Sequence, residues 1–441
     1  MKQFMTKGEA ALLVLAVSAT CVSAAVVGTN TAAEPITAER IAKSPRKQQA
    51  AWRDYLARSL RQMQADHASL EAELMAAGLA EPLTPPNGLT GRNMPLTKPA
   101  EWYGSAEARH VADIIVSFQT PAGGWGKNLN LADHVRRRGE SYVSNNISRY
   151  LASDDFDTPR DPKWNYVGTL DNDATATELQ FLARAVTAVD AKDNAAYRAS
   201  FLRGLEYLFA AQFPNGGWPQ VWPLEGGYHD AITFNDSAVT NALELLQAVA
   251  EGKDAFAFAP EKVRQRAGAS VARGLECILA TQIVENGHRT VWAQQHDAFT
   301  LQPAAGRNYE PAALCSSESA ELLLFLMSLA KPSPAMAGAI HAAAAWFQKT
   351  AIRDKAYERG PDGGRLTPAS GGRPIWARFY EIGTDRPIFA DRDKSIHDSV
   401  EELSRERRMG YNWYSSVPQE ALDRYAQWSL PHPPAKESRG N

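Results

Sequence analysis

The chain has 441 residues, which is too long for one small domain and long enough for one or two large hydrophobic cores. Its 47 Lys and Arg residues are balanced by 50 Asp and Glu residues, so the formal net charge is −3. That balance excludes the bulk basic excess expected of a general nucleic-acid binder, and we expect no nucleic-acid partner. With 44% hydrophobic and 22% charged residues, the composition is typical of a soluble globular protein.

The first 24 residues have the pattern of a signal peptide. Lys2 and Lys7 precede a short apolar run that ends in Val22-Ser23-Ala24, a sequence that resembles a small-residue cleavage site. The run is shorter than a membrane-spanning helix needs. We therefore expect residues 1–24 to be removed and the mature protein to be secreted or periplasmic, without membrane association. An uncleaved anchor is the alternative.

Helical patterning begins after a short leader. Residues 25–44 are polar and rich in Ala, and we expect them to form a flexible leader. Ser44 and Pro45 are typical of a helix start, and Gly78 is typical of a helix end. We expect one domain over residues 45–428, followed by a disordered tail over residues 429–441.

Two short patterns recur along this domain. The first is an apolar helix end followed by Gln, a Gly-rich turn and Trp, and it leads to Trp125, Trp218 and, in a looser form, Trp292. The second places Asp173 and Asp236 in the same register, each four residues before a Thr and nine residues before a Leu. Repeats spaced by roughly 60 to 90 residues indicate stacked pairs of helices.

The remaining patterns favour a mainly α fold, because strand patterns are short and weak. Helices are expected at about 174–187, 197–212, 237–251, 261–282, 317–330 and 335–350. The simplest architecture is a toroid of helical hairpins with the loops of both repeats gathered at one end. The Gly-, Pro- and Arg-rich stretch at 354–393 is expected to be irregular.

Cysteine usage excludes a disulfide framework and a structural zinc site. Without the signal peptide only Cys277 and Cys315 remain, which form one bridge at most. Both lie beside apolar helical runs, so we expect buried free thiols. Neither a C-x-x-C nor an H-E-x-x-H pattern is present.

Acidic residues precede two of the predicted helices. Asp173 and Asp236 stand where an N-cap belongs, and the simpler interpretation is that they satisfy free backbone amides. The alternative is a site for a hard cation, since calcium takes six to eight oxygen ligands and prefers carboxylates and carbonyls. Asp171-Asn172-Asp173 offers several such oxygens close together.

Three basic residues follow apolar or Gly-rich turns: Arg307, Arg392 and Lys127. A single loop Arg is most often solvated or in a surface ion pair. Two on neighbouring loops instead suit a ligand that carries carboxylates, because guanidinium binds a carboxylate through two parallel hydrogen bonds. The aromatic residues Trp125, Trp218, Trp222 and Tyr228 are candidates either for stacking on sugar rings or for core packing.

Other titratable residues give weaker indications. Glu381 and Asp385 are candidates for the acid and base of an inverting glycoside hydrolase, although their spacing does not single them out. His229, His296 and His397 fit no Ser-His-Asp or metal-binding pattern, so we expect structural roles for them.

The motifs, taken in order, resemble those of the family 10 polysaccharide lyases, which are pectate lyases with an (α/α)₃ toroid. The resemblance covers about residues 45–415 and rests on the following segments: Gly-Gly-Trp-Gly-Lys-Asn at 123–128, Leu-Asp-Asn-Asp-Ala-Thr at 170–175, Ile-Thr-Phe-Asn-Asp at 232–236, Arg-Asn-Tyr-Glu at 307–310, Ser-Ser-Glu-Ser at 316–319, Glu-Ile-Gly-Thr-Asp-Arg-Pro-Ile-Phe-Ala-Asp-Arg-Asp at 381–393 and Glu-Arg-Arg-Met-Gly-Tyr-Asn-Trp-Tyr at 406–414.

The resemblance implies a calcium-dependent enzyme that cleaves α-1,4-linked polygalacturonate by β-elimination, and we expect it to act as a monomer. Asp171 and Asp236, with Asp173, would hold calcium. Arg307 and Arg392 would be the catalytic residues. The implied substrate-binding residues are Lys127, Asn128, Trp125, Tyr309 and Asn235.

Arg307 would take the C5 proton by analogy with the family. Guanidinium groups normally stay protonated, so this role requires either neighbouring cations that lower the pKa of Arg307 or help from hydroxide. The alternative is that Arg307 stabilises the enolate-like intermediate while water carries the proton away. A glycoside hydrolase and a non-catalytic glycan-binding protein on the same toroid are the competing functions, and an unsaturated product distinguishes a lyase from both.

Overall fold

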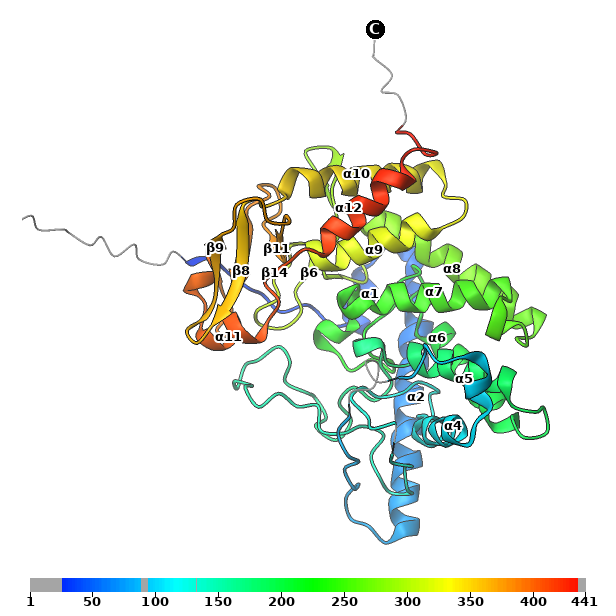
Figure 1. The fold of residues 1–441 in the computed structure, drawn as a ribbon. Coiled ribbons are helices and arrows are strands. Elements are labelled where there is room, and N and C mark those ends of the chain that lie inside the picture. The colour runs from blue at the N-terminus through cyan, green and yellow to red at the C-terminus, as the bar shows by residue number, and fades with distance from the viewer. Residues whose placement is uncertain (1–25, 89–93, 132, 435–441) are drawn as a thin grey trace, which may run out of the picture.

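The computed structural model describes residues 26–88, 94–131 and 133–434 (Figure 1). The predicted signal peptide lies outside the described residues. The fold is mainly α, as expected, with these helices: α1 (Ala38–Lys43), α2 (Arg46–Ala77), α4 (Ala106–Phe118), α5 (Ala176–Ala188), α6 (Ala195–Ala211), α7 (Ala238–Glu251), α8 (Glu261–Thr281), α9 (Ser316–Ser328), α10 (Pro334–Thr350), α11 (Arg405–Gly410) and α12 (Val417–Trp428).

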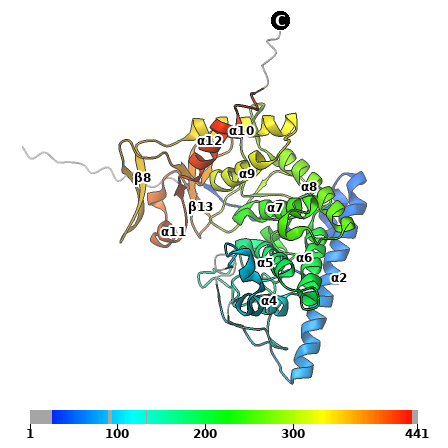
Figure 2. The same cartoon turned by 45° about the vertical axis from the view of Figure 1, so that its right-hand side comes forward.

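Consecutive helices pair into hairpins that stack in chain order. Helix α5 packs against α6, α7 against α8, and α9 against α10 and α12. Figures 1 and 2 show these pairs as successive layers above α4, with the long helix α2 running across them. All six predicted helical runs are present, with ends within about two residues of those expected. The closed toroid itself stays a prediction.

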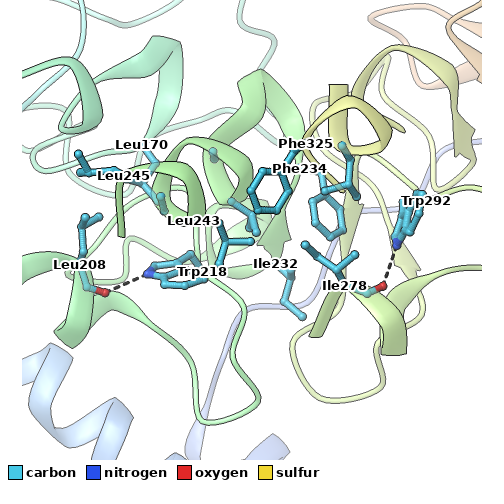
Figure 3. Packing of buried hydrophobic residues seen from close by; sticks show 14 of the residues in the cluster. Leu170, Leu208, Trp218, Ile232, Phe234, Leu243, Leu245, Ile278, Trp292 and Phe325 are labelled. Carbon is cyan, nitrogen blue, oxygen red and sulfur yellow. Dashed lines mark hydrogen bonds between the residues drawn. The ribbon is translucent and has the colours of Figure 1, made fainter. Parts of the chain in front are cut away.

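The first sequence repeat corresponds to a packing device. Trp125, Trp218 and Trp292 are fully buried, and each indole N–H donates to a backbone carbonyl of the helix before its turn. Figure 3 shows the bonds of Trp218 to Leu208 and Trp292 to Ile278, at 2.9 and 2.8 Å. Each Trp therefore anchors a turn to the helix before it. These three residues have a role in core packing rather than in stacking on sugar rings.

The Gln of the same repeat joins one hairpin to the next. Gln119 Nε2 donates to the carbonyls of Gly123 and Ser200, both at 2.8 Å. Gln212 Nε2 does the same to Gly216 and Ser270, both at 2.9 Å. One buried amide thus satisfies a carbonyl of its own turn and a carbonyl of the following outer helix, which fixes the spacing of the stack.

The segment 354–393 is not irregular, so that prediction was wrong. It contains the hairpin of β8 (Lys355–Gly360) and β9 (Gly363–Pro368), in which Gly360 pairs with Gly363. The Gly and Pro residues there mark tight turns between strands rather than a long loop. The segment also contains β10 (Trp376–Ala377), β11 (Phe379–Tyr380) and β12 (Pro387–Ala390).

A five-stranded sheet has the order β1-β13-β12-β11-β7, and its described neighbours are antiparallel. The other members are β1 (Val26–Thr29), β7 (Leu314–Cys315) and β13 (Ser395–His397). Smaller pairings involve β2 (Ile232–Thr233), β3 (Val284–Glu285), β4 (His288–Arg289), β5 (Gln295–His296), β6 (Pro303–Ala304) and β14 (Tyr414–Ser415). Strands β8, β9, β11 and β14 lie in one lobe beside the helical stack (Figure 1).

Residues 26–44 are not the flexible leader that we expected. Strand β1 pairs with β13, and Ile36 and Ile41 are buried in the main core. The leader lacks internal hydrophobic periodicity because its partners lie hundreds of residues away. At the other end, the His432 ring stacks on Trp428 at 4.4 Å, so the expected tail is partly folded onto α12. Residues 435–441 lie outside the described residues.

Candidate active site

Two short 3₁₀ turns place acidic residues side by side at the starts of inner helices. The turn Asp171–Asp173 precedes α5, the turn Asn235–Ser237 precedes α7, and the two turns contact each other. Asp173 and Asp236 have positive φ, and neither caps a helix with its side chain. The N-cap interpretation was therefore wrong, and the carboxylates are free to serve another purpose.

Asp171 is almost fully buried and surrounded by donors. It forms an ion pair with Lys127 and accepts a hydrogen bond from Gln220 Nε2 at 3.1 Å. Lys127 also lies 3.3 Å above the centre of the Tyr166 ring, which holds its ammonium group over Asp171. The Gly-Gly-Trp turn thus delivers Lys127 to the acidic residue at the start of α5.

Asp171 and Asp236 lie on turns that contact each other, and each carboxyl group shifts the pKa of the other. Burial opposes ionisation of Asp171, but Lys127, the hydrogen bond from Asp236 and the charge of Arg307 outweigh it and lower the pKa of Asp171. Desolvation and the charge of Asp171 raise the pKa of Asp236 well above its usual range. One carboxylate is therefore ionised while its partner keeps a proton, as two carboxyls in one site require.

The other predicted site residues of these turns have supporting contacts. Asp173 accepts a hydrogen bond from Asn241 Nδ2 at 2.8 Å, so its carboxylate is engaged by α7. Asn235 is buried and donates to Asp236 at 2.8 Å, which orients that carboxylate. Asn128 donates to Asn146 at 3.0 Å and accepts from Asn172 at 3.4 Å, beside the acidic pair.

Arg307 faces the same site from the loop before β7. Its side chain is 32% exposed, and its Nε and Nη2 donate to Glu310 at 2.9 and 2.5 Å. Burial works to lower the pKa of Arg307, but the carboxylate of Glu310 reverses this and raises it well above the usual value. Arg307 lowers the pKa of both Asp171 and Asp236, which places all three groups in one electrostatic cluster.

Arg392 lies on the adjacent loop after β12. Its Nε donates to Glu406 Oε2 at 2.9 Å, and its guanidinium lies 4.8 Å from the Tyr150 ring and 5.2 Å from the Tyr309 ring. Arg307 lies 5.0 Å from the same Tyr309 ring, so the structure brings Arg307 and Arg392 against one tyrosine.

Two predicted substrate-binding residues are wrong on burial grounds. Trp125 is fully buried and bound to the Ile115 carbonyl, so no ligand reaches it. Tyr309 is 4% exposed and is covered by the guanidinium groups of Arg307, Arg392 and Arg407. Tyr309 supports the arginines instead of stacking on a sugar. Trp218, Trp222 and Tyr228, the other aromatic candidates, are also buried.

The sequence analysis missed a second buried ion pair. Arg378 pairs with Glu318 at the start of α9, lies 4.8 Å from the Tyr411 ring and reaches Asn235 Oδ1 at 3.4 Å. Glu318 belongs to the Ser-Ser-Glu-Ser motif at 316–319, so a signal for it existed. Arg378 belongs to neither sequence repeat and to none of the motifs, so its place in the site could not be predicted from the sequence.

The remaining candidates have structural roles. Asp385 accepts from Trp346 Nε1 at 2.6 Å and from Lys349 at 2.5 Å on the surface, so it does not form a hydrolase pair with Glu381. His296 is buried against the Leu301 carbonyl, and His397 pairs with Glu402. Cys277 and Cys315 are buried free thiols, as expected.

Comparison with known proteins identifies the family. Residues 119–422 match the family model described as pectic acid lyase. The chain belongs to the pectic acid lyase family. Two solved structures of a family 10 polysaccharide lyase from Cellvibrio cellulosa are similar to this pectic acid lyase, each at 30% identity and each covered over 99% of its length. The match spans 79% of this chain for one structure, with a TM-score of 0.64. It spans 77%, with a TM-score of 0.63, for a mutant solved in complex with trigalacturonic acid.

No curated protein matches this chain. The family model and the two solved structures agree with the resemblance drawn from the motifs, and the chain is a polysaccharide lyase with pectate lyase activity. The matched segment contains Lys127, Asp171, Asp236, Arg307 and Arg392, so the whole charged cluster lies within it.

Proposed function

We propose that this lyase cleaves α-1,4-linked polygalacturonate by calcium-dependent β-elimination and releases 4,5-unsaturated oligogalacturonates. The observation that carries the proposal is the meeting of Asp171, Asp236 and Arg307, from the turns before α5 and α7 and from the loop before β7, in one electrostatic cluster. A related lyase solved with trigalacturonic acid supports a polyuronate as the substrate.

The acidic pair fits a hard cation. Desolvation and the charge of Asp171 raise the pKa of Asp236, and a divalent cation between the two carboxylates would relieve the repulsion between them. No cluster of three or more His, Cys, Asp or Glu residues suited to a metal occurs among residues 26–88, 94–131 and 133–434. Two carboxylates fall short of the six to eight oxygens that calcium takes, so substrate carboxylate and water would supply the rest. A bound calcium ion would neutralise charge that develops on the uronate when the C5 proton leaves.

Arg307 contributes a fixed positive charge in this proposal. The removal of the C5 proton leaves electron density on the adjacent carboxylate, and expulsion of O4 from C4 then forms the C4–C5 double bond. Despite burial, Glu310 raises the pKa of Arg307 well above its usual value, which favours the role in which Arg307 stabilises the enolate-like intermediate. Water or hydroxide takes the proton, and water protonates the departing oxygen.

Lys127 and Arg392 would hold uronate carboxylates on either side of the reacting sugar. Arg392 uses Nε for Glu406 and contacts the rings of Tyr150 and Tyr309, which restricts its orientation at low entropic cost. We also propose that the chain adopts the (α/α)₃ toroid, acts as a monomer and is secreted or periplasmic. None of the helices that the structure describes has the length and apolar character of a membrane span.

Digestion of polygalacturonate with product analysis tests the reaction type. We expect products that absorb in the ultraviolet through a C4–C5 double bond, with no ¹⁸O taken up from labelled water. A glycoside hydrolase would give saturated products that contain ¹⁸O at the new reducing end, and a glycan-binding protein would give no products. Either result would reject the proposal.

A further inference from the structure

The segment of residues 26–36, which we call the N-terminal strap, lies across both arginine loops. Strand β1 of the strap pairs with β13, directly after Arg392 and Lys394, and Asn30 N–H donates to the Lys394 carbonyl at 2.7 Å. At the other end of the strap, Ile36 N–H donates to Asp230 at 3.0 Å. The strap precedes the segment that matches the family model.

The side chain of Asn30 organises the loop that carries Arg307. Asn30 is 5% exposed, and its Nδ2 donates to the carbonyls of Arg307, Asn308 and Glu310 at 3.1, 3.0 and 3.3 Å. Its Oδ1 accepts from Thr31 N–H at 3.0 Å, which sets the orientation of the amide. The side chain of Asn30 thus hydrogen-bonds to three backbone carbonyls of one turn.

The convergence of three carbonyls in a buried place is unfavourable without a donor, because their dipoles repel one another and each loses its contact with water. Backbone N–H groups of the turn also reach two of these carbonyls, Glu310 N–H to the Arg307 carbonyl at 2.8 Å and Gly306 N–H to the Glu310 carbonyl at 3.0 Å, and the Asn30 amide adds a donor to all three. The same turn presents the Arg307 side chain, and Asn308 Nδ2 donates to the Arg392 carbonyl at 2.7 Å. The position of both arginines therefore depends on the turn.

We propose that Asn30 is a positioning residue for the lyase reaction: through the 307–310 turn it sets the placement of the Arg307 guanidinium relative to the acidic pair. This inference rests on the role assigned to Arg307 in the proposed function. It adds a residue outside the segment that matches the family model, contributed by the strap at the start of the described chain.

The test compares steady-state kinetics of full-length variants on polygalacturonate. Asn30→Asp keeps the size of the side chain but replaces the donor with an acceptor, and Asn30→Ala removes both groups. Thr31→Ala is the matched control, because the Thr31 side chain is exposed and only its backbone N–H contacts Asn30. Both Asn30 variants are repeated in an Arg307→Lys background, and thermal unfolding shows whether each variant is folded.

We expect Asn30→Asp to lower kcat on the order of 10- to 100-fold with KM little changed, as misplacement of a catalytic group does. In the Arg307→Lys background we expect Asn30→Asp to lower kcat by a much smaller factor, since the two changes act on the same interaction. Thr31→Ala should behave like the wild type. If the losses from the Asn30 and Arg307 substitutions were fully additive, or if an Asn30 variant had a normal kcat per folded molecule, this inference would be overturned while the proposed function would stand. Normal turnover by Arg307→Lys and by Arg307→Ala would overturn the role of Arg307 and, with it, the inference.

Discussion

Glu310 determines the charge state and the direction of Arg307. Glu310 accepts four hydrogen bonds. Two come from the Arg307 guanidinium group, a third from the backbone N–H of Arg307 at 2.8 Å, and a fourth from the Tyr411 hydroxyl at 2.9 Å. Burial opposes the ionisation of Glu310, but Arg307 lowers the pKa of this carboxyl to about 2. Both shifts favour the ionised form of the pair.

Glu310→Gln separates the two roles considered for Arg307. If Arg307 acts as a fixed cation, loss of its partner disorders the guanidinium and lowers kcat by about 10-fold or more. If Arg307 were the base, the loss of the negative charge would lower its pKa and shift the rise of kcat to lower pH. A pH–rate profile measures this, with Glu206→Gln at an exposed ion pair with Arg266 as the control. We expect reduced kcat without that shift.

Residue types and their order were sufficient to predict Lys127, Asp171, Asp236 and Arg307 as neighbours, because each belongs to a motif. They were not sufficient to separate buried from accessible aromatic rings. Trp125 and Tyr309 follow motifs as closely as Lys127 does, yet their rings point into the protein. The direction in which a side chain points depends on contacts between hairpins, and these contacts cannot be predicted from a local sequence pattern.

At the level of elements, the first turn of α5 contains a buried acid, Glu178. Within the described part of the chain no cation pairs with Glu178, and only Thr177 donates a side-chain hydrogen bond to it, at 3.2 Å. Desolvation raises the pKa of Glu178 to about 8. The folded state therefore binds a proton that the unfolded state releases near its ordinary pKa of 4.5.

This linkage predicts that stability falls as pH rises from the ordinary pKa of Glu178 towards its raised value. Glu178→Gln removes the titration, so the free energy of unfolding of the variant should exceed that of the wild type by a few kcal/mol above pH 8 and by little near pH 5. Urea unfolding at the two pH values measures the difference. An equal difference at both values would contradict the assignment.

The Gly-Gly turns are a second element with a steric requirement. Gly216 has φ 96°, and a Cβ there would lie 2.1 Å from the Arg273 carbonyl oxygen of α8. We expect Gly216→Ala to lower the free energy of unfolding by roughly 2 kcal/mol or more, since both strain and a clash are introduced. Gly338→Ala in α10 meets no atom within 4 Å and should stabilise by about 0.5–1 kcal/mol. Thermal unfolding compares the two, and equal effects would contradict the packing account.

Helices were predictable and strands were not. The periodicity of the apolar residues locates all six predicted helices, because a helix is stabilised along its own length. Most strands of this protein have only two residues, and their partners lie far along the chain, as β7 with β11 and β1 with β13 show. Pairing of this kind leaves no local pattern, which explains the error at 25–44. At 354–393 the β8–β9 pairing is local, and the error came from interpreting Gly and Pro residues as a loop rather than as turns between strands.

At the scale of the whole molecule, the site is assembled from both ends of the chain. The starts of α5 and α7 supply the acidic pair, the sheet lobe supplies the arginine loops, and the N-terminal strap connects those loops to each other. The stack sets the distance between hairpins through the buried Gln contacts. Activity therefore depends on the complete fold rather than on one motif.

The calcium requirement of the lyase reaction tests the central claim most directly. Formation of unsaturated product from polygalacturonate is followed for the wild type and for Asp236→Asn while calcium is removed with EDTA and then added back. We expect chelation to abolish activity and calcium to restore it. Asp236→Asn should need at least about tenfold more calcium, as the loss of a metal ligand implies. Wild-type turnover that survives EDTA, or an unchanged calcium requirement in Asp236→Asn, would contradict the account.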